Sequence, residues 1–347
     1  PRYAQATGES LLDGYMKLGR WYLLAYFFIS LGTIFTIQSA VTVVTAGLAS
    51  KLFGITDNII IWSLLITIFC SIVLIVGRYK LLDKFIKIVM VSLAISSILA
   101  VIMAFFKNGV SHSFQQVFPK KEGLLFFIAF LGWMPAPLDI SIWHSIWTLE
   151  KNKSESKTPS IKESIFDFNV GYIATTLLAI CFVGLGALVM YGTDIEFSKN
   201  GSVFAGQLIQ LYTSSLGEGA YGLIIVAAFS TMLSTTITTL DASPRSMSKT
   251  IQLLFNSKKS FYLPFLLILG SGTACIFLFL LSEMGQLVQI ATVISFITAP
   301  LYAFLNFRLV ISNQMPKEHQ PRMRLKILSI IGLFFLSSFT LFYLLSL

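Results

Sequence analysis

The chain has few charged residues for its length. Asp, Glu, Lys and Arg together make up 12% of the 347 residues, whereas hydrophobic residues make up 55%, and the mean hydropathy is +0.79. An average soluble domain carries about 25% charged residues. This shortage excludes an ordinary soluble domain and indicates an integral membrane protein.

Cysteines and nucleotide-binding motifs are equally scarce. Cys70, Cys181 and Cys275 each fall within an apolar run, which fits small core residues better than disulfides or a metal cluster. The sequence has no glycine-rich phosphate loop, so nothing in it supports ATP-driven pumping. His, Cys and acidic residues do not recur at ligand or nucleophile spacing, so we expect neither an enzyme nor a bound cofactor.

Apolar runs of about 20 residues, the length that crosses a hydrocarbon core of about 30 Å, are plentiful. They predict an all-α polytopic membrane protein with one transmembrane domain, residues 1–347. Within it, residues 1–20 form a polar cytoplasmic lead-in and residues 21–346 hold the membrane helices. The connections between runs are short, and none resembles an appended soluble module. We expect nine membrane helices, at 21–48, 57–77, 82–107, 123–149, 165–192, 219–240, 260–282, 284–307 and 325–346.

The net charge of +9 is spread unevenly between the connections. If the connections are assigned alternately to the two sides, one side holds every Lys and Arg except Lys51, Lys107, Lys120, Lys121 and Lys199. The positive-inside rule places the richer side in the cytoplasm. The first residues are therefore expected inside and the C-terminus outside, in a bacterial-type plasma membrane. No clustered basic face suggests nucleic acid, and no obligatory protein partner is inferred.

The run at 123–149 is interrupted at its midpoint by Pro135 and Pro137. Proline removes an amide donor, so carbonyls near Leu131 lose their helical partners at mid-bilayer depth, where water cannot replace them. Met134 adds a thioether at the same depth. Sulfur and carbonyl oxygen suit a transition metal, although Met134 could equally be core filler beside a kink.

Three further sets of polar residues lie within or beside the predicted helices. Asp139 could cap the helix after the break, support the site from behind or bind a cation directly. Gln289 could reach a central cavity or make an ordinary interhelical hydrogen bond. The hydroxyl-rich run at 234–239 could serve helix packing or line an inner vestibule.

Four segments resemble the NRAMP family of divalent-metal transporters, in the order that the family shows them. They are RYAQATGESLLDGY, TAGLASKLFGI, the GWMP break and FSTMLSTTITTLDASPRSMSKT. The resemblance implies a LeuT-like fold of two inverted five-helix repeats around a substrate site. The nine runs would then be helices three to eleven of eleven, with the first two helices missing.

The same resemblance assigns candidate ligands. Met134 matches the metal-binding methionine of the family, and Leu131 takes the place of an alanine that binds through its backbone carbonyl. Gln289 matches a glutamine of the tenth helix. The family's remaining ligands belong to its first helix, which is absent from this chain. The lipid bilayer and a divalent metal ion as substrate are the implied partners.

The chain also departs from the family pattern. Ala136 stands where the family has histidine after Met-Pro, and a second histidine position is Ser141. The proton-relay acids fall at about Gln38 and Val41, and residues 21–48 contain no Asp or Glu. We therefore expect alternating-access transport of Mn²⁺ or Fe²⁺, with Mg²⁺ as an alternative, weakly or not coupled to protons. An amino-acid or organic-cation symporter of the same fold and a non-transporting membrane sensor are the other hypotheses.

Overall fold

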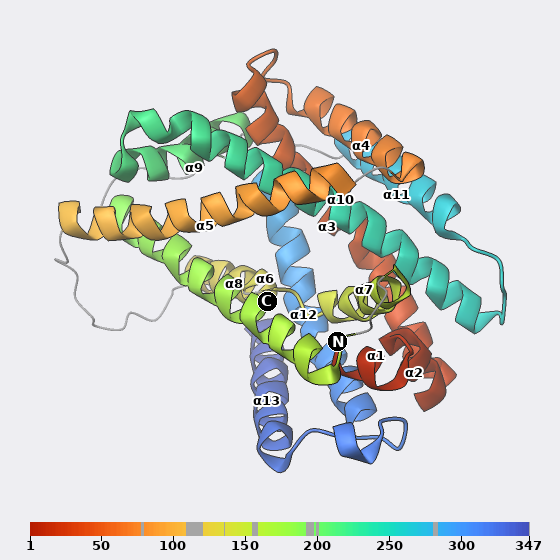
Figure 1. Ribbon diagram of the computed structural model, residues 1–347. Coiled ribbons are helices and arrows are strands. Elements are labelled where there is room, and N and C mark those ends of the chain that lie inside the picture. Colours follow the sequence, from red (N-terminus) through yellow and green to blue (C-terminus); the bar gives the residue numbers. More distant parts are fainter. Residues whose placement is uncertain are drawn as a thin grey trace.

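All regular secondary structure in the described part of the chain is helical (Figure 1). The computed structural model describes residues 1–77, 80–108, 121–134, 136–154, 159–191, 198, 201–279 and 284–346. The helices are α1 (Arg2–Thr7), α2 (Leu11–Leu18), α3 (Arg20–Phe53), α4 (Ile59–Val76), α5 (Lys80–Asn108), α6 (Lys121–Trp133), α7 (Ile140–Ser154), α8 (Ile161–Val189), α9 (Gly201–Leu216), η1 (Glu218–Ala220), α10 (Tyr221–Leu254), α11 (Tyr262–Phe279), α12 (Met284–Val310), η2 (Lys317–His319) and α13 (Met323–Ser346).

Eight helices in the described ranges are long and apolar enough to cross a membrane: α3, α4, α5, α8, α10, α11, α12 and α13. They coincide with eight of the nine predicted runs. The ninth run, 123–149, is not one helix but two shorter ones, α6 and α7. The chain is therefore an all-helical, multi-pass integral membrane protein.

Helix α10 is longer than predicted. We expected a membrane helix at 219–240, yet α10 runs on to Leu254 and contains Pro244 within it. A helix of 34 residues is about 50 Å long, which exceeds the hydrocarbon core of about 30 Å. The polar residues after 240 therefore mark where the helix leaves the membrane rather than where it ends. Hydroxyls support the extension, since Thr250 Oγ1 donates to the Ser246 carbonyl at 2.8 Å.

Helices α3 and α10 form the centre of the bundle. We compare the share of the most apolar 18-residue stretch of each helix that is buried inside the bundle. It is 56% for α3 and 44% for α10, but only 11% for α8 and for α13. Helix α3 packs on α10, α12, α4 and α9, and Figure 1 shows α13 at one edge of the molecule. Residues of α3 are therefore shielded from lipid, whereas α8 and α13 present most of their surface outward.

Polar side chains join α3 to α10. Thr45 Oγ1 and Thr236 Oγ1 lie 2.8 Å apart, and Thr239 Oγ1 donates to Gln38 Oε1 at 2.7 Å. Gln38 Nε2 also donates to the Thr236 carbonyl, at 3.4 Å. Hydroxyls of the run at 234–239 thus bond across the interface between two helices. These contacts favour packing over a vestibule for this run.

The lead-in at 1–20 is folded and docked. Ser10 and Asp13 form a capping box at the start of α2, in which each side chain accepts from the other residue's amide. The Leu11 amide donates to Ser145 Oγ of α7 at 3.1 Å, and Asp13 pairs with Lys249 of α10 at 2.8 Å. Helix α2 therefore links the second half of the broken segment to the core helix α10.

Candidate metal site at a broken helix

The break predicted between residues 131 and 139 is present. Helix α6 ends at Trp133 and α7 begins at Ile140. Within the described residues, the helical ladder of α6 ends with the Met134 amide donating to the Phe130 carbonyl at 3.0 Å. Prolines at 135 and 137 carry no N–H, so the carbonyls of Leu131 and Trp133 lose their helical donors. Pro135 itself lies outside the described residues.

Close packing on α12 holds the end of α6 in place. A Cβ atom built on Gly132 would lie 2.0 Å from the carbonyl oxygen of Thr292, so only glycine fits there. Trp133 Nε1 donates to Ser295 Oγ of α12 at 3.0 Å. The Leu131 side chain packs against the cluster around Phe296. The peptide groups at the end of α6 are thus fixed on a rigid neighbour, and no signal in the sequence predicted this contact.

Met134 follows directly at the bend. It is partly buried, as are Ala136 and Pro137, which continue the chain in non-helical conformation. The structure therefore brings the thioether of Met134 and the carbonyl of Leu131 to the same end of one helix.

The third predicted ligand, Gln289, lies on α12 with an exposed side chain. Its carbonyl accepts from Thr292 Oγ1 at 2.9 Å, and the Thr292 carbonyl is the group that Gly132 approaches. Gln289 is therefore one turn away from the contact between α6 and α12. Its role as a ligand stays a prediction.

Asp139 stands at the first position before α7. Its backbone carbonyl accepts from the Ile142 amide at 3.0 Å, whereas Oδ1 of its carboxylate has no hydrogen-bond partner among the described residues. A capping role for the side chain stays a prediction. Ser141 Oγ donates to the Leu138 carbonyl at 2.7 Å and accepts from Asn306 Nδ2 at 2.9 Å. Ser141 therefore fastens the start of α7 to α12, where the resemblance placed a histidine.

The positions of the missing proton-relay acids are neutral. Gln38 is 1% exposed, and its amide bonds to Thr239, Thr42 and the Thr236 carbonyl. Val41 is also buried. No residue of α3 is acidic. A buried network without a titratable group has no means of passing a proton by ionisation.

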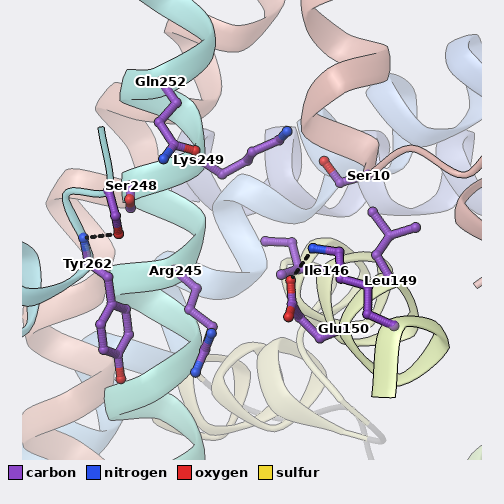
Figure 2. Close-up of a pocket in the computed structure, with 11 residues that line it drawn as sticks. Ser10, Ile146, Leu149, Glu150, Arg245, Ser248, Lys249, Gln252 and Tyr262 are labelled. Carbon is purple, nitrogen blue, oxygen red and sulfur yellow. Dashed lines mark hydrogen bonds and ion pairs between the residues drawn. The ribbon is translucent and has the colours of Figure 1, made fainter. Parts of the chain in front are cut away.

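A pocket of about 270 Å³ opens between α2, α7, α10 and α11 (Figure 2). In the close-up, Lys249 extends toward Ser10, and Arg245 lies beside Tyr262, with its guanidinium carbon 4.9 Å from the ring centre. Each cation of the wall has a carboxylate partner, in the pairs Lys249–Asp13 (2.8 Å), Arg245–Asp241 (2.7 Å) and Lys153–Glu150 (2.9 Å). The Lys249–Asp13 pair joins α10 to α2, whereas the other two pairs lie within α10 and within α7.

The described residues contain no group of three or more His, Cys, Asp or Glu side chains arranged to hold a metal ion. A site at the break would therefore depend on sulfur, carbonyl and amide groups. Together, the bundle and its interrupted helix define a polytopic helical membrane protein with a break of the kind that surrounds substrate sites in transporters.

Comparison with known proteins identifies the family. Residues 2–346 match the profile of the Nramp family, described as natural resistance-associated macrophage protein-like. The chain is 34% identical, over 99% of its length and 79% of the relative's, to an uncharacterised protein of Pasteurella multocida (strain Pm70). This chain belongs to the Nramp family. Membership implies a LeuT-like fold, a membrane environment and a metal-ion substrate, and Nramp proteins are transporters rather than enzymes.

Proposed function

We propose that this protein transports divalent metal cations of the Mn²⁺ and Fe²⁺ type by alternating access. The observation that carries the proposal is the break between α6 and α7, which leaves Leu131 and Met134 at the same end of α6. We further propose that α6 and α7 together cross the membrane as one discontinuous span. Gln289 of α12 is the candidate third ligand.

The donor set supports a choice between metals. Thioether sulfur is a soft ligand that suits transition metals, whereas Mg²⁺ and Ca²⁺ prefer shells made only of oxygen. Carbonyl and amide oxygens tolerate both kinds of ion. We therefore expect Mn²⁺ and Fe²⁺ to bind more tightly than Mg²⁺, and Mg²⁺ is the competitor to assay.

Weak or absent proton coupling forms part of the proposal. The neutral Gln38 network supports it, because α3 offers no carboxylate or imidazole along its length. A proton that moves with each metal ion needs a group that changes charge. We expect metal flux to proceed without matched proton flux.

The orientation follows from the charge distribution. We propose that α2, the end of α7 and the pocket of Figure 2 lie on the cytoplasmic side. The ion pairs around that pocket would then lie at the cytoplasmic end of the path that a metal ion takes from the break. The loop between α3 and α4 would lie outside.

The test is uptake by the purified full-length protein in liposomes that contain a metal-sensing dye or a pH dye. We expect Mn²⁺ uptake well above that of empty liposomes, with little internal acidification at zero membrane potential. Absence of Mn²⁺ flux would contradict transport. Internal acidification that matches the metal flux would contradict the absence of proton coupling, but it would leave the proposal of metal transport intact.

A further inference from the structure

Helix α12 makes hydrogen bonds to both sides of the break. On the α6 side, Ser295 Oγ accepts from Trp133 Nε1 at 3.0 Å. On the α7 side, Asn306 Nδ2 donates to Ser141 Oγ at 2.9 Å. Ser295 and Asn306 are about three turns apart on α12. One helix therefore sets the spacing between the two halves of the broken segment.

The Asn306 amide belongs to a directed chain of hydrogen bonds. Tyr15 of α2, which is fully buried, donates to Asn306 Oδ1 at 2.7 Å. Asn306 Nδ2 donates to Ser141, and the Ser141 hydroxyl donates to the Leu138 carbonyl at 2.7 Å. The amide could turn over only if both hydroxyls exchanged their roles, and Ser141 would then lose the Leu138 carbonyl. Tyr15 thus fixes which end of the amide faces α7.

The chain of hydrogen bonds ends on the first turn of α7, whose own backbone bonds are long. The Ser141 amide donates to the Leu138 carbonyl at 3.2 Å, and the Ile140 amide donates to the Pro137 carbonyl at 3.3 Å. Backbone hydrogen bonds are most often about 2.9–3.0 Å long. The shorter side-chain bond from Ser141 therefore adds support to a turn that its backbone closes weakly.

We propose that Asn306 is a positioning residue for the substrate site at the break. Through Ser141 it holds the first turn of α7 in place relative to the end of α6, and it does so without touching the metal ion. Met134 lies in the connection between these two ends, so its placement depends on both. An amide is suited to this role because it accepts from Tyr15 and donates to Ser141 at once, whereas a carboxylate only accepts.

The inference deepens the proposed function and rests on it for the metal ion, so its test has one arm without metal. That arm is hydrogen–deuterium exchange of the purified full-length protein. N306L removes both bonds of the amide at similar side-chain volume. We expect exchange in the first turn of α7 to rise several-fold in N306L, while exchange within α6 stays unchanged, because α6 has its own contacts with α12.

The second arm is Mn²⁺ binding, measured by isothermal titration calorimetry. The dissociation constant should rise by about tenfold in N306L, the lower end of what groups that orient metal ligands contribute. S141A should act in the same direction, and N306L/S141A should be no worse than N306L, since both side chains act through one bond. N152L is the matched control. It makes the same substitution at the far end of α7, where Asn152 donates to Gln5 at 2.9 Å, and should change neither measurement.

Three results would overturn the role of Asn306. Unchanged exchange in N306L would show that Asn306 does not hold α7. Exchange that rises equally throughout α7 and α12 would reduce the contact to general stability, and faster exchange with unchanged Mn²⁺ affinity would separate it from the substrate site. Should N306L fail to fold, S141A removes a single oxygen and decides the same questions. If the unmodified protein binds no Mn²⁺, the proposed function fails, whereas the exchange arm still decides whether Asn306 holds α7.

Discussion

Gly132 sets how closely α6 approaches α12. The Gly132→Ala change would place a methyl group 2.0 Å from the Thr292 carbonyl oxygen, which belongs to the backbone and cannot rotate away. The two helices must then separate. We expect Gly132→Ala to lower the free energy of unfolding by about 1–3 kcal/mol, as overpacking does elsewhere, and to lower metal affinity. Thermal unfolding in detergent and metal titration measure the two effects.

A matched control is Gly186→Ala on α8. Gly186 is also helical, but an added Cβ meets no atom within 4 Å. The control should unfold at or slightly above the temperature of the unmodified protein, since alanine favours helix over glycine. Equal behaviour of the two variants would contradict the packing account of α6.

For single residues, the sequence predicted the effects that act on groups a few positions away along the chain. The prolines at 135 and 137 act on carbonyls a few residues away, so the break could be inferred without coordinates. The contact of Gly132 with Thr292 could not be inferred, because its partner lies on a helix far along the chain. The unpartnered oxygen of Asp139 was hidden for the same reason.

Gln38 is the centre of the polar contact between the elements α3 and α10. Gln38→Ala would remove the bonds that Gln38 makes to Thr239 and to the Thr236 carbonyl in a buried interface, although those two groups keep their bond to each other at 3.1 Å. We expect a loss of about 1 kcal/mol in the free energy of unfolding for each hydrogen bond across the interface that is removed. Thermal melts of the purified protein measure it.

Thr36→Ala is the matched control on the same helix. Its hydroxyl donates within α3, to the Thr33 carbonyl at 2.8 Å, rather than across to α10. The control should cost clearly less than Gln38→Ala. If both changes cost the same, the interface network contributes nothing of its own.

Asp57 connects the end of α3 to the start of α9. Hydrogen bonds from Ser202 (2.8 Å) and Ser50 (3.1 Å), together with the charge of Lys51, hold the pKa of its carboxyl below the usual value. A depressed pKa means that the stabilisation is complete above the unfolded-state pKa of about 3.9. It is lost as the pH falls through the lower, folded-state value.

The measurement is the difference in melting temperature between the unmodified protein and Asp57→Asn, across pH 3 to 7. We expect a difference that is constant from pH 7 to about pH 5 and shrinks only at the acid end. Exposure of Asp57 to solvent keeps the effect small. A difference that grows on acidification would contradict the assignment.

For whole elements, hydropathy gave the positions of the apolar helices but not the full length of α10. The prediction stopped at 240 because polarity rises there, whereas backbone hydrogen bonding continues to Leu254. Pairing of α3 with α10 was likewise invisible, since it depends on hydroxyls and an amide that meet only in the folded bundle.

The whole molecule has a predicted orientation in the membrane. Single cysteines would be introduced at Thr56, between α3 and α4, and at Lys317, in η2 between α12 and α13, after replacement of the three native cysteines. A membrane-impermeant maleimide should label Thr56→Cys in intact cells and Lys317→Cys only after permeabilisation. The reverse pattern would invert the proposed topology.

At the scale of the molecule, composition and family landmarks in the sequence indicated the class of protein, and the match over residues 2–346 confirms the family. The metal and the coupling ion could not be read in the same way. They depend on distances between donors on different helices. Side chains that differ from the family pattern, such as Ala136 and Gln38, alter that chemistry locally.

The most direct test of the central claim is Mn²⁺ binding to the full-length protein and its Met134→Ala variant, measured by isothermal titration calorimetry. Met103→Ala, which removes an exposed methionine of α5, is the control. We expect Met134→Ala to weaken Mn²⁺ binding by roughly tenfold or more, since even supporting groups of metal sites change affinity by about 10- to 100-fold. Met103→Ala should bind as the unmodified protein does. Equal Mn²⁺ affinity in all three proteins would contradict a metal site at the broken helix.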